Sequence, residues 1–155
     1  MVREPDWLRA AKVDEALGIL EIAGSEHHPR ILEYHAHTNL HASTDEVPWC
    51  SSAVCTWMQE SGYVSTRSAR ARSWLRWGMG LLTPALGCVV VIQRGGGNQP
   101  GPKDSTATGH VGLLTGWSDT QIEILGGNQS NRVCTKSYPI GRLLGYRWPD
   151  HLPSA

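Results

Sequence analysis

The chain has 155 residues, of which 40% are hydrophobic, and this suits a single folded domain over residues 1–155 rather than a disordered segment. Fourteen basic side chains cancel fourteen acidic ones, so the charge gives no reason to expect nucleic acid or an anionic membrane surface as a partner. No stretch approaches the roughly 20 apolar residues that cross a bilayer. Residues 1–6 are polar and lack the apolar segment of a secretory signal, so we expect another system to deliver the protein if it acts outside the cytoplasm.

Helices are predicted in the first half of the chain. Apolar residues at helical spacing predict a first helix over 7–17, and a proline opens a second over 29–40. Pro48 introduces a third helix over 49–59, whose apolar positions form one buried stripe. A segment that is helical in part is expected over 66–77.

Strands are predicted in the second half. The glycine-rich stretch 95–109 is expected to be a long loop. Short apolar or alternating runs, separated by turn residues, predict strands over 88–92, 110–115, 121–125, 132–137 and 143–148. Helices followed by antiparallel strands indicate an α+β fold, in which the N-terminal helices pack on a sheet of about five strands.

Cys50 is the candidate nucleophile. It lies two residues after Pro48, which places its sulfur in the first turn of the third helix, where unpaired backbone N–H groups and the helix dipole stabilise a thiolate. Helix N-termini and a nearby imidazolium lower a cysteine pKa from about 8.5 to about 3.5–7.5. The backbone N–H groups near Cys50 and Ser51 are also placed to bind an oxyanion. The alternative is that Cys50 is a small buried hydrophobic residue.

The other three cysteines have no such position. Cys55 lies about 140° around the helix from Cys50 and in mid-helix, so the two do not share a site. Cys88 and Cys134 lie in predicted strands, where core packing explains them. The four cysteines lack CxxC spacing, which argues against a zinc knot or a dense disulfide framework.

His110 is the candidate base, because it begins a strand beside glycines and directly after the flexible loop. A turn centred on Asp119 pairs residues whose numbers sum to about 238, since strand residues face each other across a hairpin. His110 then opposes Asn128, and Leu114 opposes Ile124. An amide beside the imidazole fixes its tautomer, so Asn128 is the candidate third residue.

Several motifs resemble the NlpC-like and CHAP branches of the papain-like cell-wall peptidases. Pro-Trp-Cys-Ser-Ser-Ala-Val over 48–54, Gly-His-Val-Gly over 109–112 and Leu-Gly-Gly-Asn-Gln-Ser-Asn over 125–131 carry the likeness. The segments 68–74, Ser-Ala-Arg-Ala-Arg-Ser-Trp, and 143–149, Leu-Leu-Gly-Tyr-Arg-Trp-Pro, resemble small phage-associated members in particular.

The resemblance implies a papain-like fold with Cys50 and His110 as catalytic pair and no cofactor. Family members hydrolyse amide bonds in the stem peptides of peptidoglycan, and this is the function that we expect. NlpC-like enzymes often use a histidine as third residue and CHAP enzymes a Glu or Asn, so Asn128 fits the CHAP pattern better. Which stem-peptide bond is cut stays open, as does the choice between a phage lysin and an injected antibacterial toxin. A toxin would need a neutralising immunity protein as partner.

Four residues are candidates for substrate binding. Trp49 adjoins the nucleophile, and Arg72, Ser73 and Trp74 follow its helix. Arginine pairs with carboxylates such as those of D-Glu or diaminopimelate, and tryptophan supplies an apolar wall. The alternative is that the tryptophans belong to the core.

Two other functions are weighed against the thiol hydrolase. A catalytically silent module would keep the cleft and only bind cell wall or a protein partner. A zinc hydrolase would use the five histidines found between His27 and His41, although no His-Glu-x-x-His motif occurs there, so no metal site is predicted. A further interpretation is that Tyr34, His35 or Glu26 contacts the active-site cleft.

Overall fold

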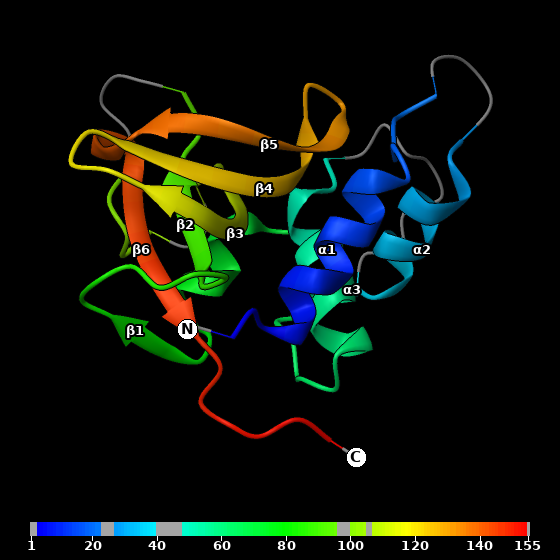
Figure 1. Ribbon diagram of the computed structural model, residues 1–155, viewed down its shortest axis with the longest axis horizontal. Coiled ribbons are helices and arrows are strands. Elements are labelled where there is room, and N and C mark those ends of the chain that lie inside the picture. The colour runs from blue at the N-terminus through cyan, green and yellow to red at the C-terminus, as the bar shows by residue number, and fades with distance from the viewer. Residues whose placement is uncertain (1–2, 23–26, 40–47, 96–99, 105–106, 155) are drawn as a thin grey trace.

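The computed structural model describes residues 3–22, 27–39, 48–95, 100–104 and 107–154. Figure 1 shows the helices gathered at one side of a twisted sheet. The fold is α+β, as the sequence predicts.

The sheet has six antiparallel strands in the order β1-β6-β2-β3-β4-β5. Their bounds are Met79–Leu81 for β1, Val89–Gln93 for β2, Gly109–Trp117 for β3, Gln121–Gln129 for β4, Arg132–Pro139 for β5 and Leu143–Trp148 for β6. The expectation of about five strands omitted β1. This strand has three residues and no apolar alternation, and it forms by pairing with β6.

The helices are α1 (Asp6–Ala16), α2 (Pro29–Ala36) and α3 (Cys50–Glu60), followed by the short 3-10 helices η1 (Ala71–Arg76) and η2 (Ile140–Arg142). The α3 helix packs against α1 and α2 on one side and against β3 and β4 on the other. Every residue over 50–58 is therefore buried, not only the apolar stripe that the sequence predicts. In the described part of the chain no helix is both long and apolar enough to cross a bilayer.

The β2 strand is buried on both faces. Val89 and Val91 belong to the core shared with the helices, whereas Val90 and Ile92 belong to a second core on the opposite face of the sheet. This explains why β2 reads as a continuous apolar run in place of an alternating one.

One buried carboxylate holds the helices together. Asp14 of α1 is 3% exposed and accepts hydrogen bonds from Tyr34 Oη at 2.6 Å, Trp57 Nε1 at 2.9 Å and Arg30 Nε at 3.1 Å. The guanidinium of Arg30 compensates the charge of the buried carboxylate. The three hydrogen bonds tie α1 to both α2 and α3. The orientation of α3, and with it the position of Cys50, depends on these contacts.

A glycine lets α3 approach the sheet. A Cβ added to Gly127 of β4 would lie 2.7 Å from the ring of Trp49 and 3.0 Å from Cβ of Ala53. The start of α3 thus lies directly against β4, which brings Cys50 to the strands that carry the polar residues described next.

Candidate active site

Cys50 lies in the first turn of α3, as predicted, and is the first residue of that helix. No side chain caps this end of the helix. The residue is 8% exposed and lines a cavity of about 330 Å³. Trp49, the residue directly before α3, is held in place by two contacts. Its indole donates to Glu21 Oε1 at 2.7 Å and stacks on the ring of Tyr34, with 5.8 Å between the ring centroids.

The surroundings of Cys50 favour its thiolate. Burial acts to raise the pKa of the thiol, but the hydrogen bond and positive charge of His110, helped by the backbone N–H groups of Val111 and Ser51, bring that pKa below its ordinary value. Burial instead raises the pKa of Cys55, and it raises the pKa of Cys88 to about 11. Among these three cysteines, only Cys50 has an environment suited to a nucleophile.

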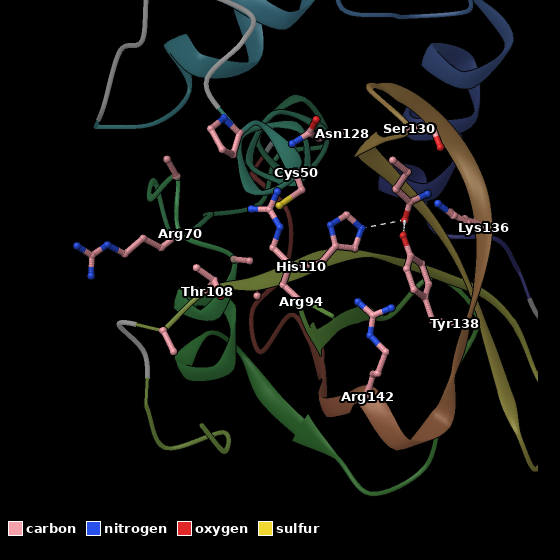
Figure 2. A pocket seen from close by; sticks show the side chains of 16 residues that line it. Cys50, Arg70, Arg94, Thr108, His110, Asn128, Ser130, Lys136, Tyr138 and Arg142 are labelled. Carbon is pink, nitrogen blue, oxygen red and sulfur yellow. Dashed lines mark hydrogen bonds between the residues drawn. The ribbon is translucent and has the colours of Figure 1, made fainter. Parts of the chain in front are cut away.

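His110 of β3 is held by Gln129 of β4. Its Nε2 lies 2.8 Å from Gln129 Oε1, the bond drawn as a dashed line in Figure 2, and the imidazole is 9% exposed. Gln129 is itself fixed, because its Nε2 donates to the carbonyls of Ile124 at 3.2 Å and Cys134 at 2.6 Å. Its Oε1 also accepts from Tyr138 Oη at 2.9 Å.

These contacts set the tautomer of His110. Since the two backbone carbonyls require the Gln129 amide nitrogen, Oε1 must face the imidazole, and an oxygen there accepts a proton held by Nε2. Nδ1 is then the ring nitrogen with a free lone pair, and it is left for Cys50. A thiol paired with a base that a third group orients is the geometry of nucleophilic catalysis.

The prediction that Asn128 orients the imidazole is corrected by this geometry. The predicted register holds in the middle of the hairpin, where Leu114 pairs with Ile124, but it is shifted by one residue at the turn, where Gly116 pairs with Glu123. The β4–β5 ladder is also irregular between Gly126 and Gln129. Asn128 has a positive φ of 56°. The irregularity adds one residue to β4, and this turns Gln129 to the face where a regular strand would place Asn128. The paired glycines at 126 and 127 are the sequence signal for this irregularity, since glycine inside a strand often marks a bulge.

Figure 2 shows the cavity from close by, with Cys50 and His110 at its centre. Asn128 lines it as well, so it remains near the site although it does not hold the imidazole. The cavity wall includes four cationic side chains and no carboxylate among the described residues; the cations are Arg70, Arg94, Lys136 and Arg142.

Two predicted substrate-binding residues are structural. Arg72 is completely buried, and it donates to the carbonyls of Thr108 at 2.8 Å, Gly101 at 2.7 Å and Asp104 at 3.2 Å. It therefore holds the loop before β3 and does not line the cavity. Trp49 is also buried and absent from the cavity wall, because its ring packs behind Cys50 against Gly127.

Ser73 and Trp74 are likewise corrected as cavity residues. Trp74 is buried and donates to Ser51 Oγ at 2.9 Å, which in turn donates to the carbonyl of Ser68 at 2.6 Å. Ser73 Oγ donates to Thr66 Oγ1 at 2.9 Å and lines a separate depression on η1. Helical geometry turns these residues away, and the arginine of the segment that lines the cavity is Arg70.

The described histidines of the predicted cluster, His27, His28, His35 and His37, lie in or beside α2 and do not line the cavity. His35 Nδ1 lies 3.0 Å from Ser52 Oγ, and His37 Nδ1 lies 3.0 Å from Thr56 Oγ1, so both connect α2 to α3. Over the residues that the structure describes, no three His, Cys, Asp or Glu side chains are grouped so as to hold a metal ion. His41 and Glu26 lie outside the described residues. Tyr34 and His35 are buried and do not line the cavity, contrary to the interpretation that either contacts the cleft.

The geometry thus unites Cys50 and His110 as predicted, replaces Asn128 by Gln129, and adds a cationic wall that sequence reasoning missed. Comparison with protein-family models, with curated proteins and with solved structures finds no match to this chain.

Proposed function

We propose that this protein is a papain-like cysteine hydrolase that cleaves an amide bond in the stem peptide of bacterial peptidoglycan. The observation that carries the proposal is the alignment of three groups at one cavity: Cys50 at an uncapped helix start, His110, and Gln129 on the far side of the imidazole. A lowered thiol pKa beside an oriented base is what acyl transfer requires.

The first half of the reaction forms an acyl-enzyme. The Cys50 thiolate attacks the carbonyl carbon of the amide, and the negative charge moves to the carbonyl oxygen. Backbone N–H groups of Cys50 and Ser51, which no capping side chain occupies at this end of α3, receive that oxyanion. His110, protonated on both ring nitrogens while Cys50 is a thiolate, donates its Nδ1 proton to the leaving amine, and the carbon–nitrogen bond breaks.

The second half releases the product. Nδ1 of His110 takes a proton from water, and the resulting hydroxide attacks the thioester carbonyl. The carbon–sulfur bond breaks and the Cys50 thiolate re-forms beside the imidazolium. Gln129 keeps Nε2 protonated throughout, so the other nitrogen serves both steps.

Two features support peptidoglycan as the substrate. The motifs around Cys50, His110 and Gln129 resemble those of the NlpC-like and CHAP cell-wall peptidases. The cavity wall is cationic, and stem peptides carry carboxylates on D-Glu, on diaminopimelate and at their C-terminus. A phage lysin and a delivered antibacterial effector are both consistent with this chemistry.

Digestion of purified peptidoglycan tests the proposal. Wild type is expected to release soluble muropeptides, Cys50→Ala to release none, and Cys88→Ala, which changes a cysteine of the second core outside the cavity, to retain activity. Equal release by wild type and Cys50→Ala would refute the thiol mechanism. Binding without release by wild type would instead identify a silent cell-wall module. Activity that survives Cys50→Ala but is lost with a chelator would identify a zinc hydrolase.

A further inference from the structure

The charge of the cavity is unbalanced. Arg70, Arg94, Lys136 and Arg142 come from four separate segments of the chain, and no Asp or Glu of the described residues lines the same space. Nor does any of the four form an ion pair with a described carboxylate. Like charges that share a cavity repel one another, so an anion placed among them is stabilised.

Arg142 is the cation that the fold orients most firmly. Its Nε and Nη2 donate to the carbonyl of Gln93 at 3.0 and 2.8 Å, and its guanidinium lies 5.0 Å from the ring centroid of Tyr138. Nη1 has no hydrogen-bond partner among the described residues. In Figure 2 the guanidinium points into the cavity on the side of His110 and Tyr138. A pre-oriented guanidinium with an unused nitrogen is suited to a planar carboxylate.

Lys136 and Arg142 lie on the same side of the cavity, with Tyr138 between them (Figure 2). Lys136 is an exposed residue of β5, and it lines the same space as Tyr138 and Arg142. Its flexible ammonium supplies a second positive charge without a fixed geometry. Arg142 therefore provides direction and Lys136 adds attraction.

We infer that Arg142 and Lys136 form a carboxylate subsite, so that the enzyme selects stem peptides with a free carboxylate close to the scissile amide. The inference rests on the proposed function and adds its specificity. Two sources fit the chemistry: the α-carboxylate of γ-linked D-Glu and a free carboxylate of diaminopimelate. Amidation of the recognised group removes its charge and one oxygen acceptor, and thereby the basis of recognition.

Muropeptides that differ by one amide test this inference. The substrates are a disaccharide-tripeptide with all its carboxylates free and two singly amidated forms, one amidated on D-Glu and the other on the side-chain carboxylate of diaminopimelate. For each substrate kcat/KM is measured by chromatography with mass spectrometry. Wild type is expected to prefer the free acid over one amidated form by about 10–100-fold, as for charge-assisted hydrogen bonds. The amidated form that loses activity identifies the source.

Variants assign the preference to residues. Arg142→Gln is expected to reduce the acid-to-amide ratio to below about 3, and Lys136→Gln to reduce it by a smaller factor. Because acid and amide are measured on the same variant, a general loss of folding or of chemistry cancels in the ratio. Arg132→Gln is the matched control, since Arg132 is an exposed cation of the same strand outside the cavity, and its ratio should equal that of wild type.

The possible failures are distinguishable. If wild type cleaves all three muropeptides equally, or if its preference persists in both Arg142→Gln and Lys136→Gln, the carboxylate subsite is refuted while the hydrolase proposal stands. If wild type cleaves neither muropeptides nor intact peptidoglycan, the proposed function fails and the subsite falls with it.

Discussion

Replacement of Gln129 by methionine should slow the chemistry at Cys50. Methionine has a similar volume but lacks the oxygen that faces His110 Nε2 at 2.8 Å. In the reaction this oxygen accepts from an imidazolium, and a hydrogen bond to a charged group is worth about 1.5–3 kcal/mol. The expected loss in kcat/KM is therefore about 10–150-fold, since 1.36 kcal/mol corresponds to a factor of ten.

The same change also affects stability, which must be separated from activity. Tyr138 Oη and the carbonyls of Ile124 and Cys134 lose their partner, so the free energy of unfolding should fall by about 2–4 kcal/mol. Urea unfolding measures this fall and shows the conditions under which the variant remains folded. Muropeptide release is then assayed under those conditions.

A pH profile separates orientation of the imidazole from a general loss of packing. Without the Gln129 oxygen, His110 no longer favours the tautomer that leaves Nδ1 free, so the pKa of Cys50 should rise. The midpoint of iodoacetamide alkylation against pH then moves upward in Gln129→Met. Asn128→Gly is the control, because glycine tolerates the φ of 56° at that position and Asn128 does not contact the imidazole nitrogen. Wild-type kinetics in Gln129→Met, or a greater loss in Asn128→Gly, would refute the reasoning.

Three predictions concern the framework. Gly127→Ala should destabilise the fold by about 1–3 kcal/mol and slow alkylation of Cys50, because the added Cβ meets Trp49 at 2.7 Å. Gly141→Ala, where the added Cβ has open space, should leave the free energy of unfolding in urea unchanged. Equal stability of the two variants would contradict the packing of α3 on β4. Asp14→Ala should lower the free energy of unfolding in urea by about 3–5 kcal/mol, because it leaves the part-buried Arg30 without this partner. Glu33→Ala removes an exposed ion-pair partner of the same arginine and should lower it by only about 0–1 kcal/mol. Similar losses in the two variants would show that burial of the Asp14–Arg30 pair is unimportant. Burial raises the pKa of Cys88 to about 11, so the unfolded chain releases the thiol proton first as pH rises above 9, and the free energy of unfolding falls. Cys88→Ala should reduce this fall in stability at alkaline pH by about 2 kcal/mol. An unchanged fall would contradict the assignment of the raised pKa to Cys88.

The position of Cys50 at the start of a helix could be predicted from the sequence, because Pro48 and the apolar run after it are local signals. The register of the β3–β4 hairpin could be predicted in its middle, at Leu114 and Ile124, but not at the turn, where Gly116 pairs with Glu123. Alternation along a strand transmits that register only as far as the strand is regular. The irregularity between Gly126 and Gln129 interrupts it, which is why Asn128 was predicted where Gln129 lies.

The failures at Arg72 and Trp49 have a different cause. Sequence adjacency to the nucleophile indicates nearness but not direction, and both side chains turn into the interior to satisfy loop carbonyls or to pack on Gly127. The cationic wall of the cavity could not be predicted because its residues are not adjacent in the sequence. Arg70, Arg94, Lys136 and Arg142 are far apart in the chain, and only the closure of the sheet and its loops brings them to one cavity.

Site-resolved alkylation of the wild-type protein tests the central claim most directly. Iodoacetamide is applied at pH 6, and mass spectrometry follows each cysteine with time. If ionisation by His110 controls reactivity, Cys50 reacts before the more exposed Cys134, and His110→Ala slows Cys50 by about tenfold or more. Alkylation of Cys134 first, with Cys50 unreactive and indifferent to His110→Ala, would contradict the account.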